Sequence, residues 1–76
     1  MTKMKVFGCK ELSVLKDFRN SPKTQKNVIK TLNEGDVVSL NTLNKYWSWD
    51  DRAYYEVDLG YGNVGYAAAD ALMEVN

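Results

Sequence analysis

The residues best suited to ligand chemistry lie in one aromatic and acidic stretch, residues 44–52. Flat rings are followed there by charged groups, namely Tyr46, Trp47, Trp49, Asp50, Asp51 and Arg52. Exposed rings can stack on a ligand, and loops on a small β scaffold are where ligands are often held. We expect some of these rings to pack over the open end of the core and the others to hold a ligand.

The chain lacks the residue types on which most catalytic and metal sites depend. Cys9 is the only cysteine, and there is no histidine. A nucleophilic cysteine would have no histidine base, a zinc site of the usual kind is excluded, and no internal disulfide is possible. We therefore expect Cys9 to be a small packed residue, and we predict no catalytic residue, no bound metal and no cofactor.

Two carboxylate pairs are the remaining candidates for acid–base chemistry. They are Asp50 with Asp51, and Glu56 with Asp58. An isolated pair on a solvated turn or strand face is far more often a surface feature than a catalytic one. A hydrolase would also need a nucleophile and an oxyanion site. The sequence therefore predicts a protein that is not an enzyme.

Length and composition bound the class of protein. Of the 76 residues, 45% are hydrophobic and 26% are charged, which is ordinary for a globular protein. We expect residues 1–76 to form a single domain. No apolar run is long enough for a transmembrane helix, and the first residues lack the apolar core of a signal peptide. We expect synthesis in the cytoplasm, so action outside a cell would require another agent to carry or release the protein.

Charge is segregated along the chain although the net charge is zero. Up to Leu32 the chain has eight lysines and arginines and two carboxylates. After Leu32 it has two lysines and arginines and eight carboxylates. Paired strands would bring the two halves together, which predicts cross-strand charge pairing. The alternative is a basic, nucleic-acid-binding face formed by the first half.

The elements that position the aromatic stretch read as short strands. The clearest is a hairpin over residues 54–66, where Val57 and Leu59 alternate with Glu56 and Asp58. Between the two strands, Gly60, Gly62 and Asn63 can adopt the positive φ angles that a short hairpin turn requires. The sequence also predicts strands over residues 3–7, 28–32, 37–43 and 73–75, with a turn at 33–36.

The remaining segments are predicted to be connections. Leu12, Val14, Leu15 and Phe18 are irregularly spaced and fit either a helix or an arched loop. Residues 16–27 are polar, and Pro22 excludes a helix interior and favours an extended Ser21, so we expect a long ordered loop. Residues 67–72 favour one helical turn. This order predicts a small, bent, antiparallel all-β barrel.

Several short segments resemble the bacterial SH3-like (SH3b) family. They are residues 18–22, 28–32, 34–38, 54–57, 62–66 and 71–72, within a match that runs from about Val14 to Val75. The resemblance implies an SH3-like barrel of five to seven short antiparallel strands, with an arched loop over residues 10–27 and a short helical turn over 68–72. The sequence departs from the family at Tyr54, where tryptophan is common, and in the longer, more aromatic stretch 44–52.

The resemblance also implies a function. Such modules bind and do not catalyse, and many are the wall-targeting parts of bacterial or bacteriophage lytic enzymes (endolysins). We expect a groove between the arched loop and the Trp47/Trp49 loop to hold a peptidoglycan peptide, with carboxylates meeting its amines. The predicted ligand-binding residues are Tyr46, Trp47, Trp49, Asp50, Asp51, Asp58 and Tyr61.

Two other functions fit the same sequence. One is a stand-alone intracellular protein–protein interaction module, perhaps encoded by a phage, that docks a partner on the same surface. The other is nucleic-acid binding through the lysines of residues 3–30, which the acidic second half disfavours. The sequence predicts no membrane partner and leaves the oligomeric state open.

Overall fold

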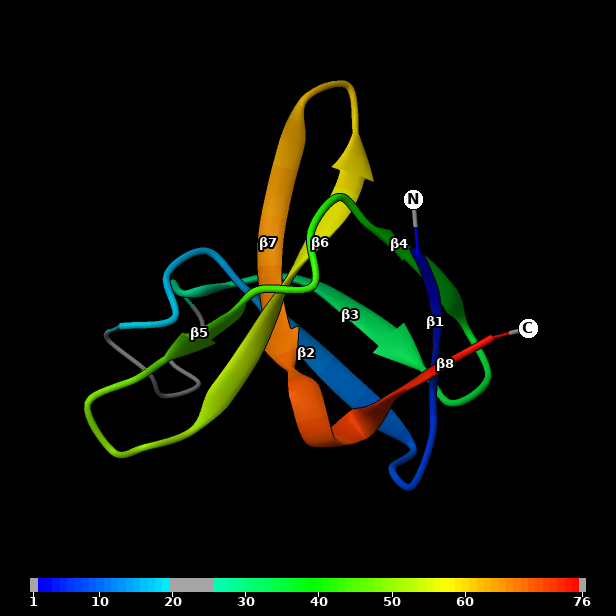
Figure 1. The fold of residues 1–76 in the computed structure, drawn as a ribbon, viewed down its shortest axis with the longest axis horizontal. Helices are drawn as coiled ribbons and strands as arrows, with labels where there is room; N and C mark the ends of the chain where they lie inside the picture. Colours follow the sequence, from blue (N-terminus) through cyan, green and yellow to red (C-terminus); the bar gives the residue numbers. More distant parts are fainter. Residues whose placement is uncertain (1, 20–25, 76) are drawn as a thin grey trace.

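The computed structural model describes residues 2–19 and 26–75, which form eight short strands and one 3-10 turn (Figure 1). In chain order the elements are β1 (Thr2–Val6), β2 (Glu11–Leu15), β3 (Val28–Asn33), β4 (Val37–Leu40), β5 (Lys45–Trp47), β6 (Ala53–Gly60), β7 (Asn63–Ala68), η1 (Ala69–Ala71) and β8 (Leu72–Glu74). The predicted all-β class is confirmed, as is the helical turn before the last strand.

All strand pairs are antiparallel and belong to one sheet, in the order β3-β2-β7-β6-β4-β1-β8, with β5 paired to β6 beside this path. β3 and β8 are the two ends of the order, and in the described part of the chain no ladder joins them. The sheet is therefore not closed as a barrel. The expected five to seven strands are too few, because two segments predicted as loop form strands.

The predicted hairpin is the longest pairing in the sheet. β6 and β7 pair from Tyr54↔Ala68 to Gly60↔Asn63, and their hairpin projects from the rest of the sheet (Figure 1). Gly60 and Gly62 have positive φ, as the sequence predicts, but the third such residue is Tyr61 and not Asn63. Val57 is fully buried, and Leu59 packs against the core, which confirms the predicted inner face of β6.

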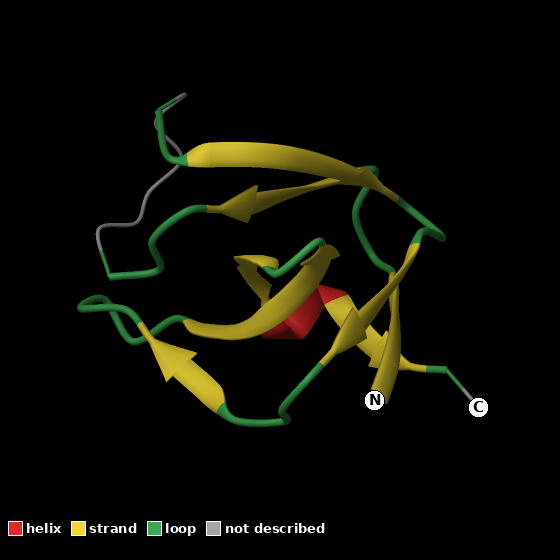
Figure 2. Cartoon of the chain, turned by 90° about the horizontal axis from the view of Figure 1, so that it is seen from above, coloured by secondary structure: helices red, strands yellow, loops and turns green. Residues whose placement is uncertain are grey.

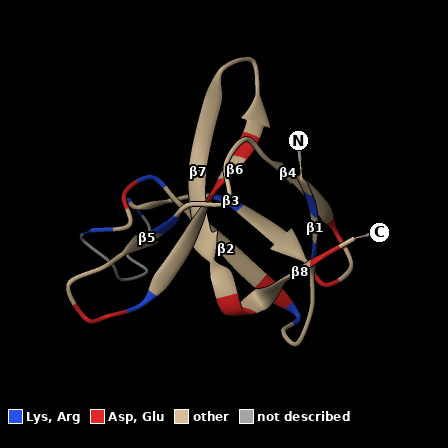
Figure 3. Cartoon of the chain, in the orientation of Figure 1, with Lys and Arg blue, Asp and Glu red and all other residues tan. Residues whose placement is uncertain are grey.

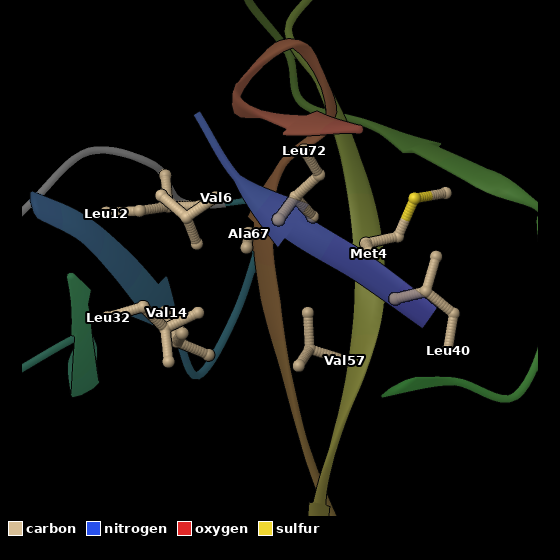
Figure 4. Close-up of a cluster of buried hydrophobic side chains, with 9 residues drawn as sticks. All are labelled: Met4, Val6, Leu12, Val14, Leu32, Leu40, Val57, Ala67 and Leu72. Carbon is tan, nitrogen blue, oxygen red and sulfur yellow. The ribbon is translucent and has the colours of Figure 1, made fainter. Parts of the chain in front are cut away.

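The core collects one or two apolar side chains from most strands (Figure 4). Its buried members are Met4, Val6, Leu12, Val14, Leu32, Leu40, Val57, Ala67 and Leu72. Cys9 is half-buried and packs against this cluster, as expected for a structural thiol. A small sheet with this core buries only about 60% of the surface of its unfolded chain, so each buried side chain matters.

The first difference from the sequence prediction is β2, which occupies part of the expected arched loop. Leu12 and Val14 point into the core, and the register to β3 shifts between Val14 and Leu15. The extra residue of this bulge is Ile29 of β3, so β2 itself alternates from Glu11 to Leu15. Its apolar spacing looks irregular because Leu15, on the other face from Leu12 and Val14, is also apolar and buried. β2 and β3 form one side of the molecule, opposite β5 (Figure 2).

The loop that follows β2 is pinned at its two ends. The Lys16 amide donates to the Asn27 carbonyl at 2.7 Å, and the Asn27 side-chain amide donates to the Asp17 carbonyl at 2.9 Å. The Arg19 amide donates to the Asp17 carboxylate, which lowers the pKa of Asp17. The predicted extended conformation at Ser21 and Pro22 lies outside the described residues.

The second difference concerns the segment between β4 and β6. The predicted strand over residues 37–43 ends at Leu40, and Leu43 is 56% exposed. The predicted loop over residues 44–52 contains β5, which pairs with the start of β6 from Lys45↔Tyr55 to Trp47↔Ala53. The aromatic stretch is thus partly a strand, and its second half is the turn between β5 and β6.

The charges do not pair across strands as predicted. The two ion pairs formed among the described residues join Arg19 to Asp17 and Arg52 to Asp50, each two positions apart in the sequence. Within residues 2–19 and 26–75 no ion pair links two strands. Along the ribbon, the positions of the lysines and arginines are spread over several elements (Figure 3).

Candidate functional site

The turn between β5 and β6 is organised by Ser48, the one buried polar residue in the part of the chain that the structure describes. Its amide donates to the Arg52 carbonyl at 2.9 Å, and its hydroxyl receives the Arg52 amide at 3.2 Å. The same hydroxyl donates to the Asp50 carboxylate, and the Asp51 amide donates to the Ser48 carbonyl. These bonds hold the backbone of residues 48–52 and leave their charged side chains at the surface.

Sequence reasoning missed Ser48, although its pattern carries a signal. A serine two residues before an aspartate is typical of a turn closed by side-chain hydrogen bonds. Asp50 also receives Arg52 Nε at 3.3 Å, so its carboxylate has two partners inside the turn. Asp51 has φ of 61°, a left-handed conformation that aspartate and asparagine tolerate better than most residues.

The two tryptophans of the turn are exposed, and the tyrosine before them is not. Trp47 is 58% exposed and Trp49 is 79% exposed, so neither packs over the core. Tyr46 is half-buried and meets Phe18 and Tyr66 with ring centroids 5.3 Å and 5.5 Å apart. Of the predicted ligand-binding rings, Tyr46 is therefore the one that has a packing role.

Phe18, Tyr46 and Tyr66 form an aromatic cluster, which brings together the loop after β2, strand β5 and strand β7. The Phe18 and Tyr66 rings meet edge to face at 4.9 Å, and the Arg19 guanidinium lies 5.8 Å from the Phe18 ring centre. Such ring pairs add about 0.5–1.5 kcal/mol each beyond their burial. The three rings therefore join the end of the predicted arched loop, at Phe18, to β5 and β7.

The pKa of Tyr66 depends on its burial in this cluster and can be used to test it. Burial raises the pKa of the Tyr66 phenol above its usual value of 10.0, and nearby Glu56 raises it further. The neutral phenol is thus favoured by folding, and its contribution to stability is complete below pH 10 and is lost as the pH rises through the folded-state pKa.

We expect the difference between the 295-nm titrations of the protein and its Tyr66→Phe variant to show a midpoint above pH 10. The phenol deprotonates there, and the variant lacks it. Tyr61→Phe, which removes a fully exposed phenol at the hairpin tip, is the matched control. A Tyr66 midpoint at or below 10 would mean that the cluster does not shield this ring.

A surface hollow of about 360 Å³, which we call the main hollow because its lining is the more apolar of two adjoining hollows, lies between β2 and the β5–β6 turn. Its wall combines Cys9 before β2, strand β2 itself, the β5–β6 turn, strands β6 and β7 and the 3-10 turn. The residues are Cys9, Glu11, Leu12, Ser13, Leu15, Asp50, Arg52, Tyr54, Ala68 and Ala71. The alternation of Glu11, Ser13 and Leu15 along β2 places them on the face opposite the core residues Leu12 and Val14.

A second hollow of about 440 Å³ adjoins the first. It is lined by Trp47, Asp51, Arg52, Ala53, Tyr54, Ala68 and Asp70. Arg52, Tyr54 and Ala68 line both hollows, so we treat the two as one feature and call it the outer groove. Four carboxylates and one guanidinium border it, which gives the groove a net negative charge.

The predicted ligand-binding residues divide among three places. Trp47, Asp50 and Asp51 border the outer groove, whereas Trp49 is exposed in the same turn without lining either hollow. Tyr46 belongs to the aromatic cluster. The structure does not bring the other two residues to this site.

Asp58 and Tyr61 lie at the far end of β6. That strand has eight residues, so its ends are about 23 Å apart at roughly 3.3 Å per residue. The Asp58 carboxylate accepts the Gly60 amide at 2.8 Å and borders a separate hollow with Lys30. Tyr61 is fully exposed in the β6–β7 turn. Neither residue shares a site with Trp47.

Most residues of the outer groove were not predicted. Glu11, Ser13 and Leu15 belong to β2, which the sequence pattern did not reveal, and Asp70 belongs to the 3-10 turn. No local signal in these segments points to a ligand. They reach Arg52 and Tyr54 only because β2 pairs with β7 at Leu15↔Tyr66 and β7 pairs with β6.

Within residues 2–19 and 26–75, no group of three or more cysteine, aspartate or glutamate side chains is arranged to hold a metal ion. The same residues include no helix long and apolar enough to cross a membrane. No protein-family model, curated protein or solved structure gives a significant match to the chain.

Proposed function

We propose that this protein is a non-catalytic binding module of the SH3-like type and that its outer groove takes a peptide from bacterial peptidoglycan. The outer groove is the observation that carries the proposal. Its two hollows measure about 360 and 440 Å³, apolar Leu15 and Tyr54 line it, and it has charged groups along its rim. This combination is typical of peptide sites on small domains.

The SH3-like assignment rests on the resemblance and on the order of the elements. A long paired arm, β2 and β3, comes before β4, and the 3-10 turn separates β7 from β8. The first and last strands are neighbours in the sheet. These features support an SH3-like arrangement with incomplete closure between its two edge strands.

Peptidoglycan is favoured over a protein ligand by the resemblance to wall-binding modules. Wall peptides carry amino groups and small side chains, which suit an acidic groove with a modest volume. The groove has no histidine or other strong base beside a nucleophile, so we propose binding without turnover. The scattered lysines and arginines give no observation in favour of nucleic acid.

The proposal is tested by blocking the groove at Cys9, which is the only thiol of the chain and lines the main hollow. We expect the unmodified protein to co-sediment with purified Gram-positive cell walls. Attachment of a bulky maleimide to Cys9 should reduce the binding at least about tenfold, because the label fills the space for the ligand.

The matched control carries Cys9→Ser with Glu74→Cys and the same label on β8, outside the groove. It should bind walls like the unmodified protein, and circular dichroism should show that both labelled proteins stay folded. No binding to any wall by the unmodified protein would refute the wall ligand. Equal binding by both labelled proteins would refute the groove as the site.

A further inference from the structure

We propose that the hollow beside Trp47 is a site for an alkylammonium group, such as the side chain of a lysine-like residue in the ligand. This inference deepens the proposed function and rests on it, because the cation would be one part of the peptide held by the outer groove. It assigns the chemical class that the groove selects and the residues that select it.

Two carboxylates in this hollow are available to a ligand. Among the residues that the structure describes, neither Asp51 nor Asp70 forms an ion pair or a side-chain hydrogen bond. They come from different elements, the β5–β6 turn and the 3-10 turn, and they border the same space. A cation in that space would meet both.

The nearby guanidinium does not neutralise them. Arg52 also lines the hollow, but its Nε is 3.3 Å from the Asp50 carboxylate, which holds the charge at the Asp50 side. Asp50 lines only the main hollow. The pairing of Asp50 with Arg52 therefore leaves the negative charge of Asp51 and Asp70 uncompensated within the second hollow.

Trp47 supplies the third element of a cation site. Its ring is 58% exposed and lines the hollow, so one surface is free to meet a ligand. Tryptophan is the aromatic side chain that attracts ammonium groups most strongly, and carboxylates beside the ring add to that attraction. A neutral or acidic side chain would gain neither contribution and would leave the carboxylates desolvated.

The geometry also explains why the cation should be on a flexible stem. The hollow is open and adjoins the apolar main hollow through Tyr54 and Ala68. The methylene chain of a lysine-like side chain would lie along these two residues while its ammonium group reaches the carboxylates.

The test compares three capped tripeptides, acetyl-Ala-X-Ala-amide, in which X is lysine, norleucine or glutamate. Binding is followed by tryptophan fluorescence in a Trp49→Phe background, so that Trp47 is the only reporter; Trp49 lines neither hollow. We expect the lysine peptide to bind at least about tenfold more tightly than the norleucine peptide, since it adds a cation–π contact and two ion pairs. The glutamate peptide should bind most weakly, and added salt should reduce the lysine preference.

The decisive variant is Asp51→Asn with Asp70→Asn, which removes both charges and keeps the side-chain size. Asparagine tolerates the left-handed backbone of residue 51, so the turn should persist. The variant should lose the preference for lysine over norleucine. Glu34→Gln with Glu74→Gln removes the same total charge at positions that line neither hollow, and should keep it.

Each outcome bears on one of the two proposals. Equal binding of all three peptides would overturn the ammonium site while leaving peptide binding in the groove intact. A lysine preference that survives in the double aspartate variant would overturn the assignment to Asp51 and Asp70. Failure of wall binding together with the expected lysine preference would refute the wall ligand alone. If no peptide binds and n-butylammonium leaves the Trp47 fluorescence unchanged, the ammonium site is refuted.

Discussion

Leu40→Ala is expected to lower the free energy of unfolding by about 2–5 kcal/mol, the usual cost of removing a buried leucine side chain. Leu40 is 1% exposed and belongs to the core cluster, at the end of β4 where it pairs with Thr2 of β1. A chain of this length has a total stability of about 4–11 kcal/mol, so the loss is a large fraction of it. Urea unfolding followed by circular dichroism measures the change.

Leu43→Ala is the matched control for this prediction. It removes the same atoms three residues later, from a side chain that is 56% exposed, and should cost less than about 0.5 kcal/mol. If Leu40→Ala is too unstable to measure, Leu40→Val removes one methylene group and gives a smaller, measurable loss. Equal costs at the two leucines would contradict the end of β4 at Leu40.

Leu40 and Leu43 show which part of the predicted strand over residues 37–43 the hydrophobic pattern located correctly. Both are apolar and lie in a run that reads as one strand, but an apolar residue has no mark that separates a core position from an exposed one. Leu40 pairs with Thr2 of β1 and belongs to the core, whereas Leu43 lies beyond the pairs that β4 forms with β1 and β6. Partners distant in sequence decide such a boundary, and the sequence of one strand does not contain that information.

Local signals predicted the parts of the fold that local forces determine. The β6–β7 hairpin follows from alternation around Val57 and from glycines in the turn, and the 3-10 turn follows from a short run of alanines before β8. β2 and β5 were missed for opposite reasons. β2 has buried apolar residues on both faces at its end, Val14 on one and Leu15 on the other, which hides its alternation, and β5 has only three residues, which is too short for any periodicity.

The candidate site was predicted only where its residues are consecutive. The aromatic and acidic stretch gave Trp47, Asp50 and Asp51, whereas Tyr46 packs against Phe18. The opposite wall of the groove comes from β2 and the 3-10 turn, which do not adjoin the stretch in the sequence. Tertiary pairing creates that wall, so residue types alone gave no indication of it.

Strands β2 and β7 are paired neighbours that come very close at Gly65, which is buried in β7. A Cβ atom built on Gly65 would clash with Val14 Cγ1 and would lie 3.1 Å from Ile29 Cδ1 and 3.3 Å from the Leu15 carbonyl oxygen. Val14 is fully buried and stiff at χ1, so it cannot easily move away. Gly65→Ala should therefore destabilise the protein by about 1–3 kcal/mol through overpacking, despite adding apolar surface to the core.

A double-mutant cycle tests whether Val14 is the residue that a side chain at position 65 would overpack. Val14→Ala removes Cγ1, the atom closest to the new methyl group, and leaves the contacts with Ile29 and the Leu15 carbonyl. The cost of Gly65→Ala should then fall by at least about 1 kcal/mol, a coupling typical of residues in contact. An unchanged cost would show that Val14 does not cause the overpacking. A reduced cost would show that β2 approaches β7 closely only because residue 65 has no side chain, and this approach places Ser13 and Leu15 beside the outer groove.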